Sequence, residues 1–281
     1  MGRKVRNSIR LQSVGLPAVS QHAGRNGVIP LKQSIFVMAS NKPKREEPFR
    51  FKQFAIAQDR CSMKVGTDGV LLGAWANTDK VHTALDIGTG TGLIAIMLGQ
   101  RLPGAQIHAV EIDEIACEQA MENAAHAPWS DRLHIHQESI QDFTRRWPDP
   151  FDLIVSNPPF FTGGTFSDNQ GRNSVRHTVK LPHNDLLTSV RRLLSPDGCF
   201  CLILPLIEGL RFRELAETYQ LYCTRITEVH PKADKPVERL LMQFEREPKN
   251  CPTDKLIIQK EERNDWREEY VELTKDFYLY M

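Results

Sequence analysis

The most informative stretch of the sequence is Ile154-Val155-Ser156-Asn157-Pro158-Pro159-Phe160. Residues 151–156 form a short apolar run with the length of a buried strand, and the two prolines forbid its continuation. Each proline fixes its own φ and pushes the preceding residue toward extended geometry, so the backbone here is almost predetermined. An amide and a carbonyl are therefore expected just beyond a strand's carboxyl end, where open α/β sheets bind ligands. With the flat ring of Phe160, the stretch predicts a receptor for an amino group on a planar ring.

The composition is ordinary for a soluble globular protein with a sizeable core. Of the 281 residues, 41% are apolar and 25% are charged. The longest apolar runs are too short to cross a bilayer, and the chain begins with no secretory-type apolar segment. The six cysteines form no CxxC pair, and no thiol or carboxylate joins His134 and His136 at metal-ligand spacing. We therefore expect a cytoplasmic protein with reduced thiols, no membrane segment and no metal.

Basic residues are concentrated at the start of the chain. Residues 1–48 contain nine Lys and Arg residues against two Glu residues, whereas the remainder carries a small excess of acids. Such a leader can be a nucleic-acid-binding arm. Because it has neither helical periodicity nor interleaved aromatics, we favour a disordered leader, or a start codon assigned too early with Met38 as the true start.

The segment that follows the leader predicts a hairpin and a capped helix. Residues 49–57 alternate in the manner of a strand or hairpin. A polar stretch over 58–69 then leads to a helix expected at 70–76, which Thr67 or Asp68 can cap. Two interpretations remain open here. The stretch is either a capped helix and nothing more, or a lid over a cofactor lined by Lys64, Thr67 and Asp68.

A glycine-rich turn predicts a ligand pocket. A strand at 83–87 leads into Asp86-Ile87-Gly88-Thr89-Gly90-Thr91-Gly92, and a helix is expected at 93–102. The glycines let the backbone turn sharply and approach a ligand closely, with helix N–H groups facing it. Dinucleotide enzymes share such a turn, so alone it is weak evidence. A second strand, 105–111, ends in Glu111, 19 residues after Gly92, where an acid can bind a ribose diol.

The rest of the chain alternates strands and helices, which implies a parallel, doubly wound sheet. The pattern gives seven strands, and the link 231–236 is so short that the last two should pair antiparallel. We predict an α/β fold with a main domain at 49–248, of which 49–80 form the hairpin and lid helix. Residues 249–281 are expected to be an appendage packed on that domain.

Seven segments carry a resemblance to a known family. They are Phe51-Lys52-Gln53-Phe54, Asp59-Arg60-Cys61, Met63-Lys64-Val65-Gly66-Thr67-Asp68-Gly69, Leu72-Gly73-Ala74-Trp75, Asp86-Ile87-Gly88, Ser156-Asn157-Pro158-Pro159 and Phe277-Tyr278-Leu279-Tyr280-Met281. The proline motif resembles the (N/D/S)-P-P-(Y/F/W) signature of Rossmann-fold S-adenosylmethionine-dependent N6-adenine methyltransferases. From about Phe51 to Met281, the chain is similar to the bacterial valine-tRNA adenine-37 N6-methyltransferase family. Residues 1 to about 48 lie outside this resemblance.

The resemblance implies a Rossmann-like class I methyltransferase sheet, S-adenosylmethionine as cofactor, and methylation of the N6 amine of adenosine 37 in the anticodon loop of valine tRNA. It implies catalytic roles for Asn157, Pro158 and Phe160. The implied cofactor contacts are Lys64, Thr67, Asp68, Asp86, Gly88, Gly90, Gly92, Glu111, Ser139, Asp142 and Asn157.

Two positions depart from the family's pattern. Phe160 stands where the family has tyrosine or another aromatic, so the ring can still stack but the hydroxyl is missing. Where a third-strand acid often touches the cofactor's adenine, this chain has Glu138-Ser139, and Asp142 one turn later is the alternative.

The residues themselves suggest a mechanism. An exocyclic adenine amine is a poor nucleophile because its lone pair is delocalised into the ring. The Asn157 amide oxygen and the Pro158 carbonyl can accept its two N–H bonds as the nitrogen becomes tetrahedral, and fixed dipoles then stabilise the developing charge. An RNA base must leave its stack to reach such a pocket.

Several alternatives remain open from sequence. The same pocket suits a glutamine side-chain amide on a protein or an adenine in DNA, and a binding protein without catalysis or a nicotinamide oxidoreductase is a further class. For a tRNA substrate, Arg172, Arg176 and Lys180 of the loop after Phe160 are the candidate RNA contacts. The competing interpretation is that Arg176 only pairs with an acid to order the loop. We expect the protein to act as a monomer.

Overall fold

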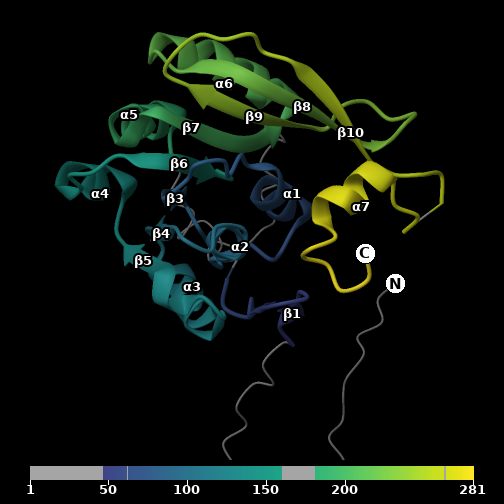
Figure 1. Cartoon of the computed structure of the whole chain (residues 1–281), viewed down its shortest axis with the longest axis horizontal. Helices are drawn as coiled ribbons and strands as arrows, with labels where there is room; N and C mark the ends of the chain where they lie inside the picture. Colours follow the sequence, from purple (N-terminus) through teal and green to yellow (C-terminus); the bar gives the residue numbers. More distant parts are fainter. Residues whose placement is uncertain (1–46, 62, 160–180, 263) are drawn as a thin grey trace, which may run out of the picture. The chain divides into compact units, whose positions relative to one another are not determined.

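The computed structural model describes residues 47–61, 63–159, 181–262 and 264–281 (Figure 1). All of these residues belong to one unit that runs from Lys44 to Met281. The leader and the loop that carries Phe160, Arg172, Arg176 and Lys180 lie outside the described residues.

The described part of the chain builds an eight-stranded sheet with strand order β10-β8-β9-β7-β6-β3-β4-β5. The strands are β3 (Thr83–Ile87), β4 (Gln106–Glu111), β5 (Leu133–Gln137), β6 (Phe151–Ser156), β7 (Leu194–Pro205), β8 (Tyr222–Lys232), β9 (Arg239–Glu245) and β10 (Thr253–Gln259). Only β9 runs antiparallel to its neighbours β7 and β8, and every other described pair in this sheet is parallel. The predicted fold class is therefore confirmed, including the antiparallel pairing of the strand near 237–245.

The strand count differs from the sequence prediction. The C-terminal residues were expected to form an appendage, but Thr253–Gln259 pairs parallel with β8 and extends the sheet to eight strands. This edge strand begins with exposed polar residues and buries only Leu256 fully. Its sequence therefore lacks the apolar run that marks the inner strands.

Helices cover both faces of the sheet, which explains why the inner strands are apolar on both sides. The helices are α1 (Thr67–Trp75), α2 (Leu93–Arg101), α3 (Glu114–His126), α4 (Ile140–Arg146), α5 (His183–Leu193), α6 (Leu206–Thr218) and α7 (Glu268–Thr274). Successive residues of β6 point to opposite faces: Leu153 and Val155 join the cluster under α1 and α2, whereas Ile154 joins the one under α5 and α6. This alternation is the two-residue period of a strand.

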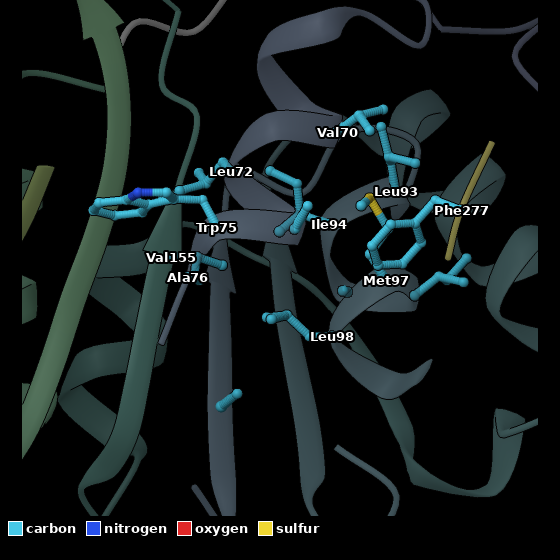
Figure 2. Packing of buried hydrophobic residues seen from close by; sticks show 14 of the residues in the cluster. Val70, Leu72, Trp75, Ala76, Leu93, Ile94, Met97, Leu98, Val155 and Phe277 are labelled. Carbon is cyan, nitrogen blue, oxygen red and sulfur yellow. The ribbon is translucent and has the colours of Figure 1, made fainter. Parts of the chain in front are cut away.

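The N-terminal helix packs closely on α2. Gly73 of α1 faces Met97 of α2 so closely that a Cβ at Gly73 would lie 2.8 Å from the Met97 sulfur. Figure 2 shows Met97 beside Leu93 and next to Phe277 from the C-terminal segment. A short hairpin, β1 (Phe49–Arg50) with β2 (Ala55–Ile56), precedes α1 and confirms the hairpin expected at 49–57. The start and the end of the described chain thus share one core with α2.

The start of α1 corrects a detail of the sequence analysis. The helix begins at Thr67, with Gly66 at the N-cap position and no side chain capping it. The sequence predicted a helix that starts at Val70 and is capped by Thr67 or Asp68. In the structure both residues lie inside the helix and neither caps it. The Asp68 carboxylate instead accepts a hydrogen bond from Arg239 of β9 at 2.8 Å, and this bond joins α1 to the sheet.

Candidate active site

The proline pair lies at the point where the sheet reverses its direction of growth. From β3 the chain adds β4 and β5 on one side, then crosses back to place β6 on the other side of β3. Ligands bind outside the carboxyl ends of the strands at such a switch point. Asn157, Pro158 and Pro159 follow directly after β6, and Ser156 anchors its end by donating a hydrogen bond to the Ile87 carbonyl at 2.8 Å.

Two cavities meet at this switch point, with volumes of about 370 Å³ and about 700 Å³. Asn157, Pro158 and Pro159 line both cavities, and so do Gly88 and Gly90. The structure thus brings together the two motifs that the sequence analysis singled out, although 65 or more residues separate them along the chain. Both volumes fall within the ~300–1,000 Å³ typical of small-molecule sites.

The glycine-rich turn leaves open space toward the cavities. Gly88 and Gly90 have φ values of 73° and 58°, a conformation that residues with a Cβ rarely adopt. A Cβ built at either position would meet no atom within 4 Å. The backbone there faces empty space, as a site for close backbone-to-ligand approach requires. Gly92, by contrast, lines neither cavity, and a Cβ built there would lie 3.4 Å from Ala120 of α3.

The two strand-end acids have different environments. Glu111 lines the first cavity, where its carboxylate accepts hydrogen bonds at 2.9 Å from the backbone N–H groups of Gly90 and Asp113. Asp86 is fully buried and lines neither cavity. Its Oδ2 accepts hydrogen bonds from Thr89 Oγ1 at 2.6 Å and from the Ala95 backbone N–H at 3.2 Å. Asp86 therefore connects the glycine-rich turn to α2 from the interior of the protein, outside both cavities.

Burial dominates the electrostatics of Asp86. It raises the pKa of the carboxyl from 3.8 to about 7, against the two hydrogen bonds, which favour the ionised form. Its second oxygen, Oδ1, is buried without a hydrogen-bond partner among the described residues. This carboxyl is costly to ionise, as expected for a charge removed from water.

The far wall of the first cavity contains Ser139 but not Asp142. Ser139 is the N-cap of α4, and its hydroxyl accepts a hydrogen bond from the Asp142 backbone N–H at 3.0 Å. The same hydroxyl donates to the Asp142 carboxylate at 2.6 Å, which lowers the pKa of Asp142. Asp142 also forms an ion pair with Arg145. Asp142 therefore orients Ser139 from outside the cavity.

The predicted lid residues line the second cavity. The wall of this cavity includes Lys64, Thr67 and Asp68. An ion pair between Asp68 and Arg239 joins this segment to β9. These residues line a cavity as well as the start of a helix, and their role as a lid over a cofactor stays a prediction.

The Asn157 amide has the environment of a receptor. Its Oδ1 atom is buried and has no hydrogen-bond partner among the described residues. Burying a polar atom without a partner costs free energy, so such an atom in a ligand cavity is a candidate for ligand contact. Asn157 itself lines both cavities, so its side chain is placed where they meet.

Sequence reasoning missed several residues that line the cavities. Cys61 and Ile112 belong to the first cavity, and Arg239, Gln259 and Trp266 to the second. Cys61 stays a thiol, because burial and then the Glu111 charge raise its pKa to about 11. The last three come from the C-terminal strands and the segment before α7, far from the motifs. No local spacing pattern signalled them.

Within the described ranges, no group of three or more His, Cys, Asp or Glu side chains is placed to hold a metal ion. His108, His134 and His136 stack on one another beside Trp147 in the half-buried surface of β4 and β5. Burial lowers the pKa of His108 to about 4 and also lowers that of His136. In the described part of the chain, no helix is long and apolar enough to span a membrane.

The fold and the paired cavities fit one class of enzyme, the Rossmann-like methyltransferases. The sequence profile of the "Methyltransferase small domain" family matches residues 64–194. A predicted O-methyltransferase from Agrobacterium tumefaciens has the same fold, with a TM-score of 0.60 and 17% identity over 75% of this chain and 96% of that one.

Closer relatives give the family. A tRNA1(Val) (adenine(37)-N6)-methyltransferase from Pectobacterium carotovorum is 44% identical over 84% of this chain and 96% of the relative. A protein of the same name from Bacteroides thetaiotaomicron is 45% identical over 83% of this chain and 98% of that relative. The chain belongs to the tRNA1(Val) (adenine(37)-N6)-methyltransferase family, which confirms the predicted resemblance.

Proposed function

We propose that this protein uses S-adenosylmethionine to methylate the N6 amine of adenosine 37 in valine tRNA. The observation that carries the proposal is the buried, unpartnered Asn157 Oδ1 at the junction of the two cavities. An amide oxygen in that position recognises an N–H donor, and the exocyclic amine of adenine supplies two. The names of the two relatives supply the target nucleoside.

The described residues fit the methyl donor. Gly88 and Gly90 leave open space where a ligand can approach the backbone. Glu111 lines the first cavity, and its proposed role is to bind the ribose diol of the donor. Ser139 lines the same cavity and is the candidate contact to the donor's base, with Asp142 fixing its hydroxyl. When bound, S-adenosylmethionine supplies a methyl group already activated on a sulfonium.

The chain's own contribution is to orient the amine and stabilise charge on it. Asn157 Oδ1 and the Pro158 carbonyl accept the two N–H bonds, which turns the nitrogen lone pair away from both acceptors. As the nitrogen becomes tetrahedral and positive, these two dipoles stabilise it without having to reorganise. The fixed backbone of the proline pair keeps the two acceptors in place. The correct positioning of the amine therefore supplies much of the rate enhancement that charge stabilisation does not. Phe160, outside the described residues, is proposed to stack on the base.

Transfer of labelled methyl groups to defined substrates tests this function. The purified protein is incubated with labelled S-adenosylmethionine and, separately, with unmodified valine tRNA, the same transcript with adenosine 37 replaced by guanosine, duplex DNA and a protein fraction. We expect label in the first tRNA only, recovered as N6-methyladenosine after nuclease digestion. Label in protein would indicate glutamine methylation, and label in DNA or equal label in both transcripts would also contradict the proposal.

We further propose that the enzyme acts as a monomer in the cytoplasm. The proposal is supported by the fact that one chain supplies both cavities and the residues that line them. Sedimentation of the protein at working concentrations, alone and with tRNA, is expected to give one protein chain per particle. A dimer that dissociates with loss of activity would contradict it.

A further inference from the structure

The second cavity extends from the proline pair to the C-terminal part of the chain. Besides the lid residues, its wall includes Arg239 of β9, Ile258 and Gln259 of β10, and Trp266 and Tyr270 at the start of α7. Its volume of about 700 Å³ is roughly twice that of the first cavity. Under the proposed function only one base, adenosine 37, has to reach Asn157, so this C-terminal wall has no assigned role.

Trp266 is held firmly at the cavity wall. It forms an antiparallel bridge with Gln259, flanked by backbone hydrogen bonds from Lys260 to Asp265 at 2.8 Å and from Arg267 to Ile258 at 3.0 Å. These bonds fasten the segment before α7 to the edge of the main sheet. Figure 1 shows α7 next to α1 and the end of β10, consistent with the contacts between these elements. The ring is therefore presented on a pinned backbone rather than on a free loop.

The Trp266 side chain is partly buried beside a buried tyrosine. Trp266 packs against Tyr270, with ring centroids 5.4 Å apart and planes inclined by 41°. Tyr270 is buried at 2% exposure, whereas Trp266 is only partly buried and lines the cavity. A partly buried tryptophan in a cavity wall, packed against a second aromatic ring, is a side chain on which an unpaired base can stack.

Charged side chains lie in the same cavity wall. Lys64 lines it from the lid side and Arg239 from β9, where the Arg239 Nε donates to the Asp68 carboxylate at 2.8 Å. This ion pair ties the lid to the sheet and fixes the guanidinium near the cavity. Cations there reduce the cost of bringing a phosphodiester close to the carboxylates of Asp68 and Glu238, which line the same cavity.

We propose that Trp266 stacks on a second base of the RNA, a direct neighbour of adenosine 37, in the C-terminal part of this cavity. The inference rests on the proposed function and names a further contact for the same substrate. The physical reason is that extruding adenosine 37 leaves its neighbours without a stacking partner. The indole face replaces that partner, with Lys64 and Arg239 beside the phosphate that joins the two nucleotides.

A mutant cycle between protein and RNA tests the contact. Wild type and Trp266→Ala are each titrated with four anticodon stem-loops: intact, or abasic at position 36, at position 38 or at a distant loop position. Removing the indole is expected to weaken binding of intact RNA about 5- to 150-fold. Wild type should lose the same affinity for one of the two RNAs that are abasic at position 36 or 38. For that RNA, Trp266→Ala should cause little further loss of affinity.

Three controls separate stacking from packing. Trp266→Phe keeps a ring and should retain most of the binding, and Trp266→Leu keeps apolar bulk and replaces the Ala variant if that variant does not fold. Trp147→Leu removes an indole that packs on Phe143 and Phe151 and lines neither cavity, so it should leave RNA affinity unchanged. Affinity for S-adenosylhomocysteine should be unaffected in all variants.

The outcomes distinguish this inference from the proposed function. Suppose that wild type methylates adenosine 37, but that the fold-losses of RNA affinity caused by Trp266→Ala and by each abasic site multiply independently. Trp266 is then a packing residue and the inference is wrong. Equal affinity of wild type for all four RNAs would also overturn it. If wild type does not methylate adenosine 37 at all, the proposed function fails first.

Discussion

Replacing Asp86 by asparagine should remove a pH dependence from the stability of the protein. The folded-state pKa of Asp86 is raised to about 7 from an ordinary value of 3.8, because the carboxyl is fully buried. Between these two pH values the folded chain holds a proton that the unfolded chain has lost. The free energy of unfolding is therefore higher at low pH and falls as the pH rises toward 7. Asparagine has no such proton and abolishes this contribution.

The size of the effect follows from the two pKa values. From pH 5 to the folded pKa of about 7 is two pH units, and each unit corresponds to about 1.36 kcal/mol, so the contribution of Asp86 decreases by about 2.7 kcal/mol between pH 5 and pH 8. The assay is urea unfolding of wild type and Asp86→Asn at several pH values across that range. Subtracting the variant's curve removes the titration of every other group.

The expected result is a stability difference between the two proteins that shifts by about 2.7 kcal/mol in favour of the variant as the pH rises. Two curves that stay parallel from pH 5 to pH 8 would refute the reasoning, because they would mean that Asp86 is already ionised at pH 5 in the folded protein. Parallel curves are the result expected if the hydrogen bonds from Thr89 and Ala95 outweigh burial and keep the folded-state pKa near or below 3.8.

Three other substitutions probe the site and the core. Gly90→Val should abolish S-adenosylhomocysteine binding in calorimetry, because a branched residue at φ 58° is strained and fills the space left for the ligand; undiminished affinity would mean that the pocket is misplaced. Glu111→Ala should weaken the same binding about 10- to 100-fold by removing a charged hydrogen-bond partner; the calorimetric affinity of wild type is the reference, and no change would exclude the ribose contact. Gly99→Ala should lower the free energy of unfolding by about 1–3 kcal/mol, since its Cβ would meet the Trp129 ring; equal urea midpoints would contradict this.

The fold was predictable where the burial of an element is reflected in its own local sequence pattern. The strand before Asn157 is an apolar run because both faces of β6 are covered, and the glycine-rich turn and proline pair are local motifs with fixed backbone consequences. The edge strand β10 was not predicted as part of the sheet. It is partly solvated and begins with Thr253-Asp254-Lys255, so its membership depends on pairing with β8 rather than on its own pattern.

The candidate site was predictable to a smaller extent. Gly88, Gly90 and Glu111 line the cavities, as motif spacing suggested, but Asp86 lies behind the turn because the strand that carries it points that side chain into the interior. The contribution of Arg239 could not be predicted, since it meets Asp68 across 171 residues of sequence. Such contacts are set by how the C-terminal strands and α7 fold back, which no local pattern records.

In the proposed mechanism, Asn157 Oδ1 accepts an N–H of the target amine. The most direct measurement is the single-turnover rate of adenosine 37 methylation by Asn157→Ala, with protein and S-adenosylmethionine in excess over tRNA. We predict a rate at least about 100-fold below wild type, with S-adenosylhomocysteine affinity within a few-fold. A rate within a few-fold of wild type would contradict the claim, because the amine would then need no acceptor at this position.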